Sequence, residues 1–133
     1  MKWGIRTIVT IIALMLLFSA CDAHSNKIDV PVTGNMKIVH NGFDPDLTFE
    51  AFIETIPSIS IDDEKQILSI LNGKEYVNDA PACVCDLIIN SDNNMFLIHT
   101  EGGAVITTVD DRSISCILSD TELKELLTIC ETY

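Results

Sequence analysis

The feature that most constrains the fold is a change in the spacing of apolar residues along the chain. Between residues 49 and 71, apolar residues recur every three or four positions, which is the period of an α-helix. From residue 83 to residue 118 they alternate with other residues, as in a β-strand, and after residue 119 the helical period returns. Helices that precede and follow a block of strands, rather than alternating with them, predict an α+β domain.

The first predicted helix lies between two prolines. Asp44 or Asp46 is its expected N-cap, Pro45 suits the first turn, and Pro57 ends the helix. Its apolar stripe consists of Phe49, Phe52, Ile53 and Ile56. The stripe marks the apolar face of this helix.

The second and the last predicted helices have clear start signals. Ser60 is the expected N-cap of a helix over residues 62–72. The first three residues of this helix are acidic, and their negative charge is stabilised by the positive end of the helix dipole. Ser119, with Glu122 three positions later, forms a capping box for the last helix. The expected apolar sides are Ile67, Leu68 and Leu71 in the former, and Leu123, Leu126, Leu127 and Cys130 in the latter.

The strands are predicted to form an antiparallel meander. Short turn-forming stretches separate the alternating segments, as in successive hairpins. The predicted strands cover residues 83–90, 95–100, 104–109 and 112–119, and residues 36–42 are a further candidate for a short edge strand. The expected fold is therefore an antiparallel sheet of about four strands, preceded by two helices and closed by a C-terminal helix.

The N-terminus has the parts of a secretory signal peptide. Lys2 and Arg6 form a positive region, residues 8–18 are apolar apart from one threonine, and Ser19 and Ala20 are small. The apolar run is shorter than the roughly 20 residues of a transmembrane helix. An uncleaved anchor helix over residues 3–20 is the alternative.

The stretch "FSAC" at residues 18–21 resembles the lipobox of bacterial lipoproteins, with Phe18 where that family more often has leucine. The resemblance covers residues 1–21 only. It implies a diacylglycerol on Cys21, usually with an acyl chain on the new amine, and a location in the cell envelope facing the periplasm or the exterior. In enteric-type bacteria, Asp22 would resemble a signal for retention in the inner membrane. The implied organisation is a signal peptide at 1–20, a tether at 21–35 and one α+β domain at 36–133.

The charge of the predicted mature chain limits its partners. Six basic and twenty acidic residues follow Ala20, which gives a formal net charge of −14. Such a surface repels phosphate backbones, so we expect no nucleic-acid partner, and it repels anionic lipid headgroups. It attracts a basic protein or a cation, although acidic residues can also serve solubility alone.

Four cysteines remain after Cys21, and each lies on the apolar side of a predicted element. An even number of cysteines in an exported chain suggests disulfide bonds, and buried free thiols are the alternative. Sequence alone does not choose among the three pairings, but we expect Cys130 to bond Cys83 or Cys85 across the interface of helix and sheet. The disulfide candidates are Cys83, Cys85, Cys116 and Cys130.

No catalytic, cofactor or metal site is predicted. Placing Cys83 and Cys85 inside a strand argues against a redox pair, because reactive thiols are exposed and have a lowered pKa. His99 and three of the cysteines are zinc-ligand types, but their spacing matches no zinc motif. Nucleophile-elbow, phosphate-loop and dinucleotide motifs are absent from the sequence.

These features favour a lipid-anchored protein that acts by binding rather than by catalysis. A compact acidic domain could neutralise a basic secreted toxin or hydrolase, as an immunity or inhibitor protein does. An accessory envelope protein without an inhibitory role, or a small envelope enzyme with no linear motif, is the alternative.

Overall fold

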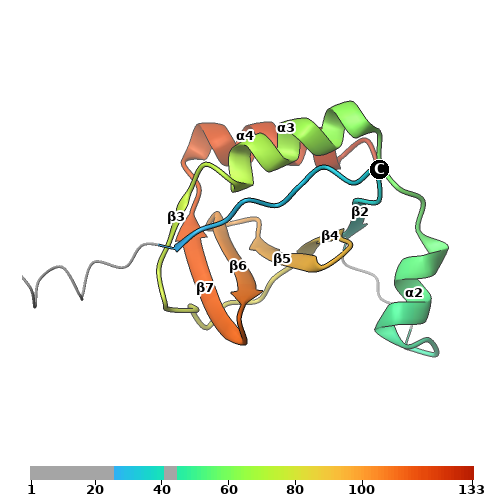
Figure 1. Cartoon of the computed structure of the whole chain (residues 1–133), viewed down its shortest axis with the longest axis horizontal. Coiled ribbons are helices and arrows are strands. Elements are labelled where there is room, and N and C mark those ends of the chain that lie inside the picture. Colours follow the sequence, from blue (N-terminus) through green and yellow to red (C-terminus); the bar gives the residue numbers. More distant parts are fainter. Residues whose placement is uncertain (1–25, 41–44) are drawn as a thin grey trace, which may run out of the picture.

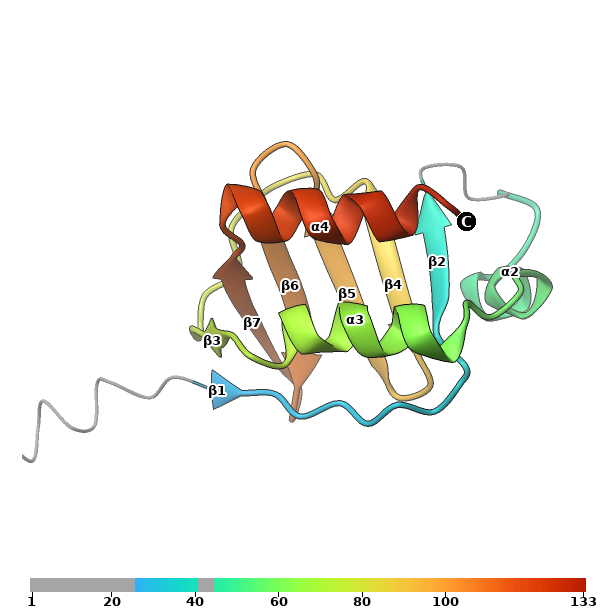
Figure 2. The same cartoon turned by 90° about the horizontal axis from the view of Figure 1, so that it is seen from above.

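The computed structural model describes residues 26–40 and 45–133 and confirms the α+β class. An antiparallel five-stranded sheet carries two helices, α3 and α4, side by side on one face, and α2 lies apart at one edge (Figures 1 and 2). In chain order the elements are β1 (Asn26–Lys27), β2 (Lys37–His40), α2 (Phe49–Thr55), α3 (Ile61–Leu71), β3 (Glu75–Tyr76), β4 (Leu87–Ser91), β5 (Asn94–His99), β6 (Ala104–Val109), β7 (Arg112–Ile117) and α4 (Asp120–Cys130). The core lies between the sheet and the pair of helices.

The sheet has the order β2-β4-β5-β6-β7, so the predicted meander is confirmed and β2 extends it at one edge. The register of the ladders places alternate residues of every strand on the helix side. The buried residues of that side include Ile38, Leu87, Ile89, Phe96, Ile98, Val105 and Ile114. Alternation in the sequence therefore predicted the core face of the sheet correctly.

The predicted strand at 83–90 begins later than expected, because β4 starts at Leu87. On one side its partner strand β2 ends at His40, which pairs with Leu87. On the other side one further hydrogen bond, from the Asp86 N–H to the Ile98 carbonyl at 3.1 Å, continues toward β5. Cys83 and Cys85 therefore precede the strand, in an irregular segment rather than inside the sheet.

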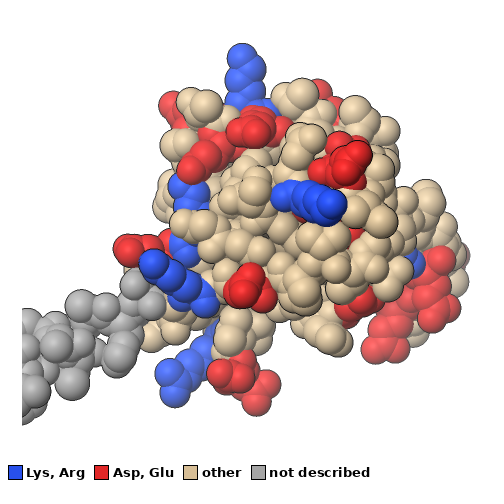
Figure 3. All heavy atoms as spheres, turned by 45° about the horizontal axis from the view of Figure 1, so that its top comes forward, with Lys and Arg blue, Asp and Glu red and all other residues tan. Residues whose placement is uncertain are grey.

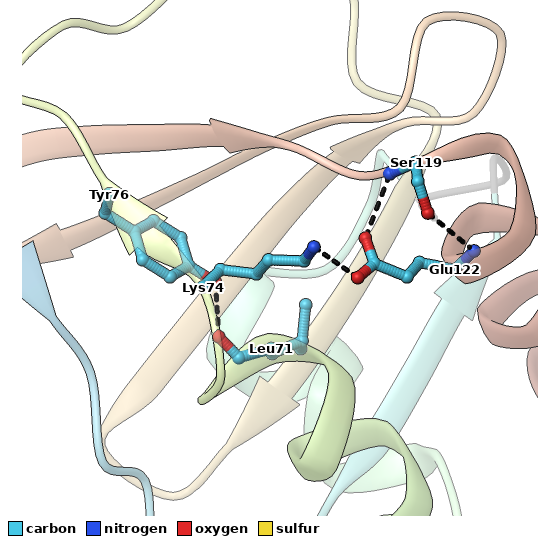
Figure 4. A network of polar contacts seen from close by, with 5 residues as sticks. All are labelled: Leu71, Lys74, Tyr76, Ser119 and Glu122. Atoms are coloured by element: carbon cyan, nitrogen blue, oxygen red, sulfur yellow. Dashed lines mark hydrogen bonds and ion pairs between the residues drawn. The ribbon is translucent and has the colours of Figure 1, made fainter.

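Helices α3 and α4 form where the sequence predicted them. Ser60 caps α3 by accepting the Asp63 N–H at 3.2 Å. The capping box of α4 is complete, since Ser119 accepts the Glu122 N–H at 3.2 Å and Glu122 accepts the Ser119 N–H at 2.9 Å (Figure 4). Lys74, just after α3, forms an ion pair with the same Glu122 and so ties the end of α3 to the start of α4 (Figure 4).

Helix α2 starts later than predicted and differs from α3 in its surroundings. Its N-cap is Thr48, which accepts the Ala51 N–H at 3.2 Å, and not Asp46, which lies in the preceding turn; Asp44 is outside the described residues. The helix ends at Thr55, shortly before Pro57 as expected. None of its seven residues is buried.

The predicted tether at 21–35 is shorter than expected, because the chain packs on the domain from residue 26 onward. Strand β1 pairs with β3 in a small antiparallel sheet. Ile28, Val30 and Met36 are all buried in the core cluster. Tether sequence from residue 26 to residue 35 is therefore part of the folded domain.

Two side chains of the α3 region hold this N-terminal segment. Glu64 is fully buried, and its two carboxylate oxygens accept the backbone N–H groups of Thr33 and Gly34, each at 2.9 Å. Asn72 accepts the N–H of Val30 and donates to its carbonyl, both at 3.0 Å. We attributed Glu64 to the helix dipole from sequence alone, but it satisfies backbone groups that would otherwise be buried without a partner.

The predicted signal peptide, Cys21 and Asp22 lie outside the described residues. Within residues 26–40 and 45–133, no helix has both the length and the apolar character needed to cross a membrane.

Candidate functional site

The four cysteines of the domain do not converge on one point in the interior, and all four are free thiols. Cys116 is buried on β7, the last strand of the sheet. Cys130 is buried at the end of α4, where its carbonyl contacts the His40 ring at 3.0 Å beside β2. Burial raises the pKa of the Cys116 thiol, and burial, followed by the nearby Glu131, raises the pKa of Cys130 to about 12.

Strand order limits the disulfide bonds that are possible. Cys130 lies beside β2 and β4, and Cys85 lies just before β4, so both are three or more strand spacings from β7. Three spacings amount to roughly 14 Å, whereas a disulfide requires Cα atoms within about 7 Å. Cys116 therefore lies too far from Cys85 and from Cys130 to form a disulfide bond with either of them.

A hollow of about 340 Å³ lies between the C-terminal half of α4 and the end of the sheet. Its lining residues are His40, Asp86, Leu87, Thr100, Leu127, Cys130 and Glu131. The Asp86 carboxylate accepts hydrogen bonds from both the N–H and the hydroxyl of Thr100, and the hydroxyl bond above all lowers its pKa.

The chemistry of this hollow is limited by bonds within the domain. His40 contacts the Cys130 carbonyl, and the Cys130 thiol has a raised pKa, which is the opposite of an activated nucleophile. In the described part of the chain, no group of three or more His, Cys, Asp and Glu residues could hold a metal ion. The hollow therefore presents bound polar groups rather than a set poised for acid–base or metal chemistry.

A stronger candidate for a functional site is a surface at the opposite end of the molecule from β1. Here the first turn of α3 meets the end of the chain after α4, because Tyr133 accepts the Ser60 N–H at 3.2 Å and donates to Asp63, and α2 stands beyond them at the β2 edge (Figure 2). Acidic side chains gather over these elements, most visibly around the protruding α2 (Figure 3). The acidic residues of this end are Asp46, Glu50, Glu54, Asp62, Asp63 and Glu131.

Basic residues lie mostly toward the other end. Lys27 is in β1, Lys74 precedes β3 and Arg112 begins β7, near Asn26. At the acidic end, the Lys37 ammonium donates to the Ile53 carbonyl at 2.9 Å and so fixes the last turn of α2 to β2. Asp46, Glu50 and Glu54 thus lie beside one lysine whose ammonium is already bonded, so α2 carries a local excess of negative charge.

The same end exposes apolar side chains. Leu47 has 37% of its surface exposed, and every apolar residue of α2 is only half-buried. We call this region the α2 surface; it consists of residues 46–56 with the neighbouring Asp62 and Asp63. A half-exposed apolar helix within a ring of carboxylates is a pattern typical of protein-binding surfaces.

Sequence reasoning identified the apolar stripe of α2 but did not identify it as part of a candidate binding surface. Periodicity shows which side of a helix is apolar and not what covers it. The shortness of the segment between Thr48 and Pro57 was the one available signal, since a two-turn helix buries little surface. In comparisons with protein-family models, with curated protein sequences and with solved structures, no match to this chain is found.

Proposed function

We propose that this protein is a lipid-anchored protein of the bacterial cell envelope that binds a basic protein partner through its α2 surface. The observation that carries the proposal is that α2 has an amphipathic sequence, yet none of its residues is buried. Within this role we favour inhibition of a basic secreted toxin or hydrolase. An accessory envelope protein that inhibits nothing is the alternative.

The position of the α2 surface suits an anchored domain. The described part of the chain begins at β1, five residues after Cys21 in the sequence, at the end of the molecule away from α2 (Figure 1). A lipid on Cys21 would therefore hold the β1 end nearest the membrane and leave α2 at the distal end. A partner approaching from the periplasm or the exterior would meet the acidic, apolar end first.

Charge favours a basic partner. The acidic residues around α2 would speed the encounter with a cationic surface and would disfavour acidic competitors. Desolvated apolar contacts on α2 would then supply most of the affinity, as buried anchors do at other interfaces. Both effects fall on one surface.

The partner can be tested with a photo-crosslinking residue placed at Leu47, with Thr128 on the exposed side of α4 as the matched control position. In intact cells we expect a crosslinked product at position 47 and none at position 128, with a partner of basic isoelectric point. Glu50→Lys should weaken the crosslink, and Glu125→Lys, which changes an exposed glutamate on α4 in the same way, should not. A crosslink that is insensitive to Glu50→Lys would contradict the proposed charge recognition.

The anchor is tested separately. Radiolabelled palmitate should label the wild-type protein and not Cys21→Ser, and the wild type should fractionate with membranes. If the wild-type protein were unlabelled and soluble, the anchor would be refuted, and the proposal for the α2 surface would be unaffected. Purified partner and chain should then show whether binding abolishes the partner's activity, which separates inhibition from an accessory role.

A further inference from the structure

The pair Cys83 and Cys85 has a setting that differs from that of the other two cysteines. Both are half-buried, and Val84 between them is 82% exposed. Because exposure alternates in this extended segment, the two thiols lie on the same side of the chain and Val84 points to solvent. The pair lies outside the sheet, so the objection that these thiols are held inside a strand does not apply.

Contacts on both sides hold this segment in place. The Cys83 N–H donates to the Pro81 carbonyl at 3.0 Å, and the Val84 carbonyl accepts the Nδ1–H of His99 at 2.8 Å. Asp86 is fixed by its two bonds to Thr100. The thiols are thus presented by a backbone that is positioned from β5 and not by a free loop.

Geometry permits a bond between these two sulfurs. Residues two apart along the chain have Cα atoms at most about 7 Å apart, since consecutive Cα atoms are 3.8 Å apart. Disulfide bonds span about 4.4–6.8 Å between Cα atoms. The two thiols also lie close enough to interact: burial, and next the negative charge of a Cys83 thiolate, raise the pKa of Cys85 to about 11. This raised pKa slows attack by Cys85 at neutral pH, so the pair closes by slow exchange and is not an activated redox centre.

We propose that Cys83 and Cys85 form a reversible dithiol–disulfide site. Oxidation occurs by thiol–disulfide exchange with a low-molecular-weight or protein disulfide. One thiolate attacks that disulfide and releases one thiol; the second thiolate then attacks the mixed disulfide, forms the Cys83–Cys85 bond and releases the other thiol. The pair loses two electrons and two protons, and the external disulfide gains them.

Reversibility follows from the position of the pair. A bond closed across one residue, in a half-exposed segment, belongs to the strained and accessible class of disulfides that are easily reduced. Cys116 and Cys130 are buried and remain thiols under the same conditions. The site is independent of the α2 surface and of the lipid anchor, so either can fail without affecting it.

Trypsin separates the possible outcomes, because cleavage after Lys74, Arg112 and Lys124 places the cysteines on different peptides. Residues 75–112 hold Cys83 and Cys85, while the next two peptides hold Cys116 and Cys130. The purified full-length chain is treated with oxidised glutathione, denatured, blocked with N-ethylmaleimide and digested. We expect peptide 75–112 to lack maleimide and to be two hydrogens lighter, the other two peptides to be alkylated, and dithiothreitol to reverse the change.

Two results would overturn the proposal. A crosslink between peptides 75–112 and 125–133 would show that Cys130 takes one of the pair, as the sequence led us to expect. Two maleimides on peptide 75–112, at glutathione ratios that oxidise ordinary half-exposed dithiols, would show that the pair does not close.

Matched variants keep the test sharp. Cys83→Ser and Cys85→Ser should each stop at a single glutathione adduct on peptide 75–112, because the second thiol is absent. Cys116→Ser should leave the internal bond unchanged. Circular dichroism of all variants confirms that they fold, and a bond that survives in Cys83→Ser would refute the assignment.

Discussion

Helices α2 and α3 are consecutive helices with similar sequence patterns and opposite surroundings. Each has an apolar stripe and a hydroxyl N-cap that accepts the N–H three residues later, at 3.2 Å in both. Helix α3 buries five residues against the sheet, and α2 buries none. The comparison shows that a helical stripe predicts an apolar face but leaves open whether the chain itself or another protein covers that face.

The difference has a structural cause. Helix α3 crosses the middle of the sheet beside α4, whereas α2 stands at the β2 edge (Figure 2). A hydrogen bond from Lys37 to the Ile53 carbonyl attaches α2 to that edge. Because α2 lies beyond the core, its stripe contributes little to folding, and this leaves it suited to binding.

The largest expected effect on stability comes from a substitution in α3, the helix that packs on the core. Leu71 in α3 is fully buried, so Leu71→Ala should lower the free energy of unfolding by about 2–5 kcal/mol through the lost apolar contacts and the cavity left behind. Ile53→Ala in α2 should lower it by less than about 1 kcal/mol, because that side chain is only half-buried. Urea denaturation followed by circular dichroism measures both. Equal losses would show that α2 belongs to the cooperative core.

Much of the core could be predicted from the sequence because it depends on local periodicity. Alternation grouped Leu87 with Ile89 and Ile114 with Cys116 on one face of their strands, and the capping motifs at Ser60 and Ser119 located α3 and α4. These signals lie within a few residues of the element that they define, so no knowledge of the rest of the fold was needed.

The features that sequence reasoning missed depend on distant parts of the chain. Glu64 resembles an ordinary residue of a first helical turn, and its role comes from Thr33 and Gly34, thirty residues earlier. The distance of Cys116 from Cys85 and Cys130 was missed because alternation gives the face of a strand and not its place in the sheet.

The second prediction concerns the buried carboxylate of α3. Glu64→Gln replaces one of the two accepting oxygens by an NH₂ group that faces a backbone N–H, so one buried donor loses its partner. We expect a loss of about 1–3 kcal/mol in the free energy of unfolding. Asp62→Asn, an exposed residue of the same turn, is the control and should change stability by about 0.5 kcal/mol or less.

Hydrogen exchange adds a local measurement to this variant. If Glu64 holds the N-terminal segment, the Glu64→Gln variant should exchange faster at the amides of residues 28–36 than at those of β5. Uniform acceleration across the domain would instead indicate a general loss of stability, and the proposed clamp of the N-terminal segment would then be unsupported.

The smallest effect, and the most closely matched test, comes from the two N-caps. Ser60→Ala and Thr48→Ala each remove one side-chain acceptor of the same backbone N–H position at the same distance. Because α3 is part of the core, losing its cap should lower the free energy of unfolding by about 1 kcal/mol. Losing the cap of α2 should leave the free energy of global unfolding almost unchanged. It should instead speed amide exchange within residues 49–55, because α2 can fray without disturbing the core. If the two variants lost equal global stability, α2 would be coupled to the core, and its half-buried stripe could no longer be regarded as a face reserved for a partner.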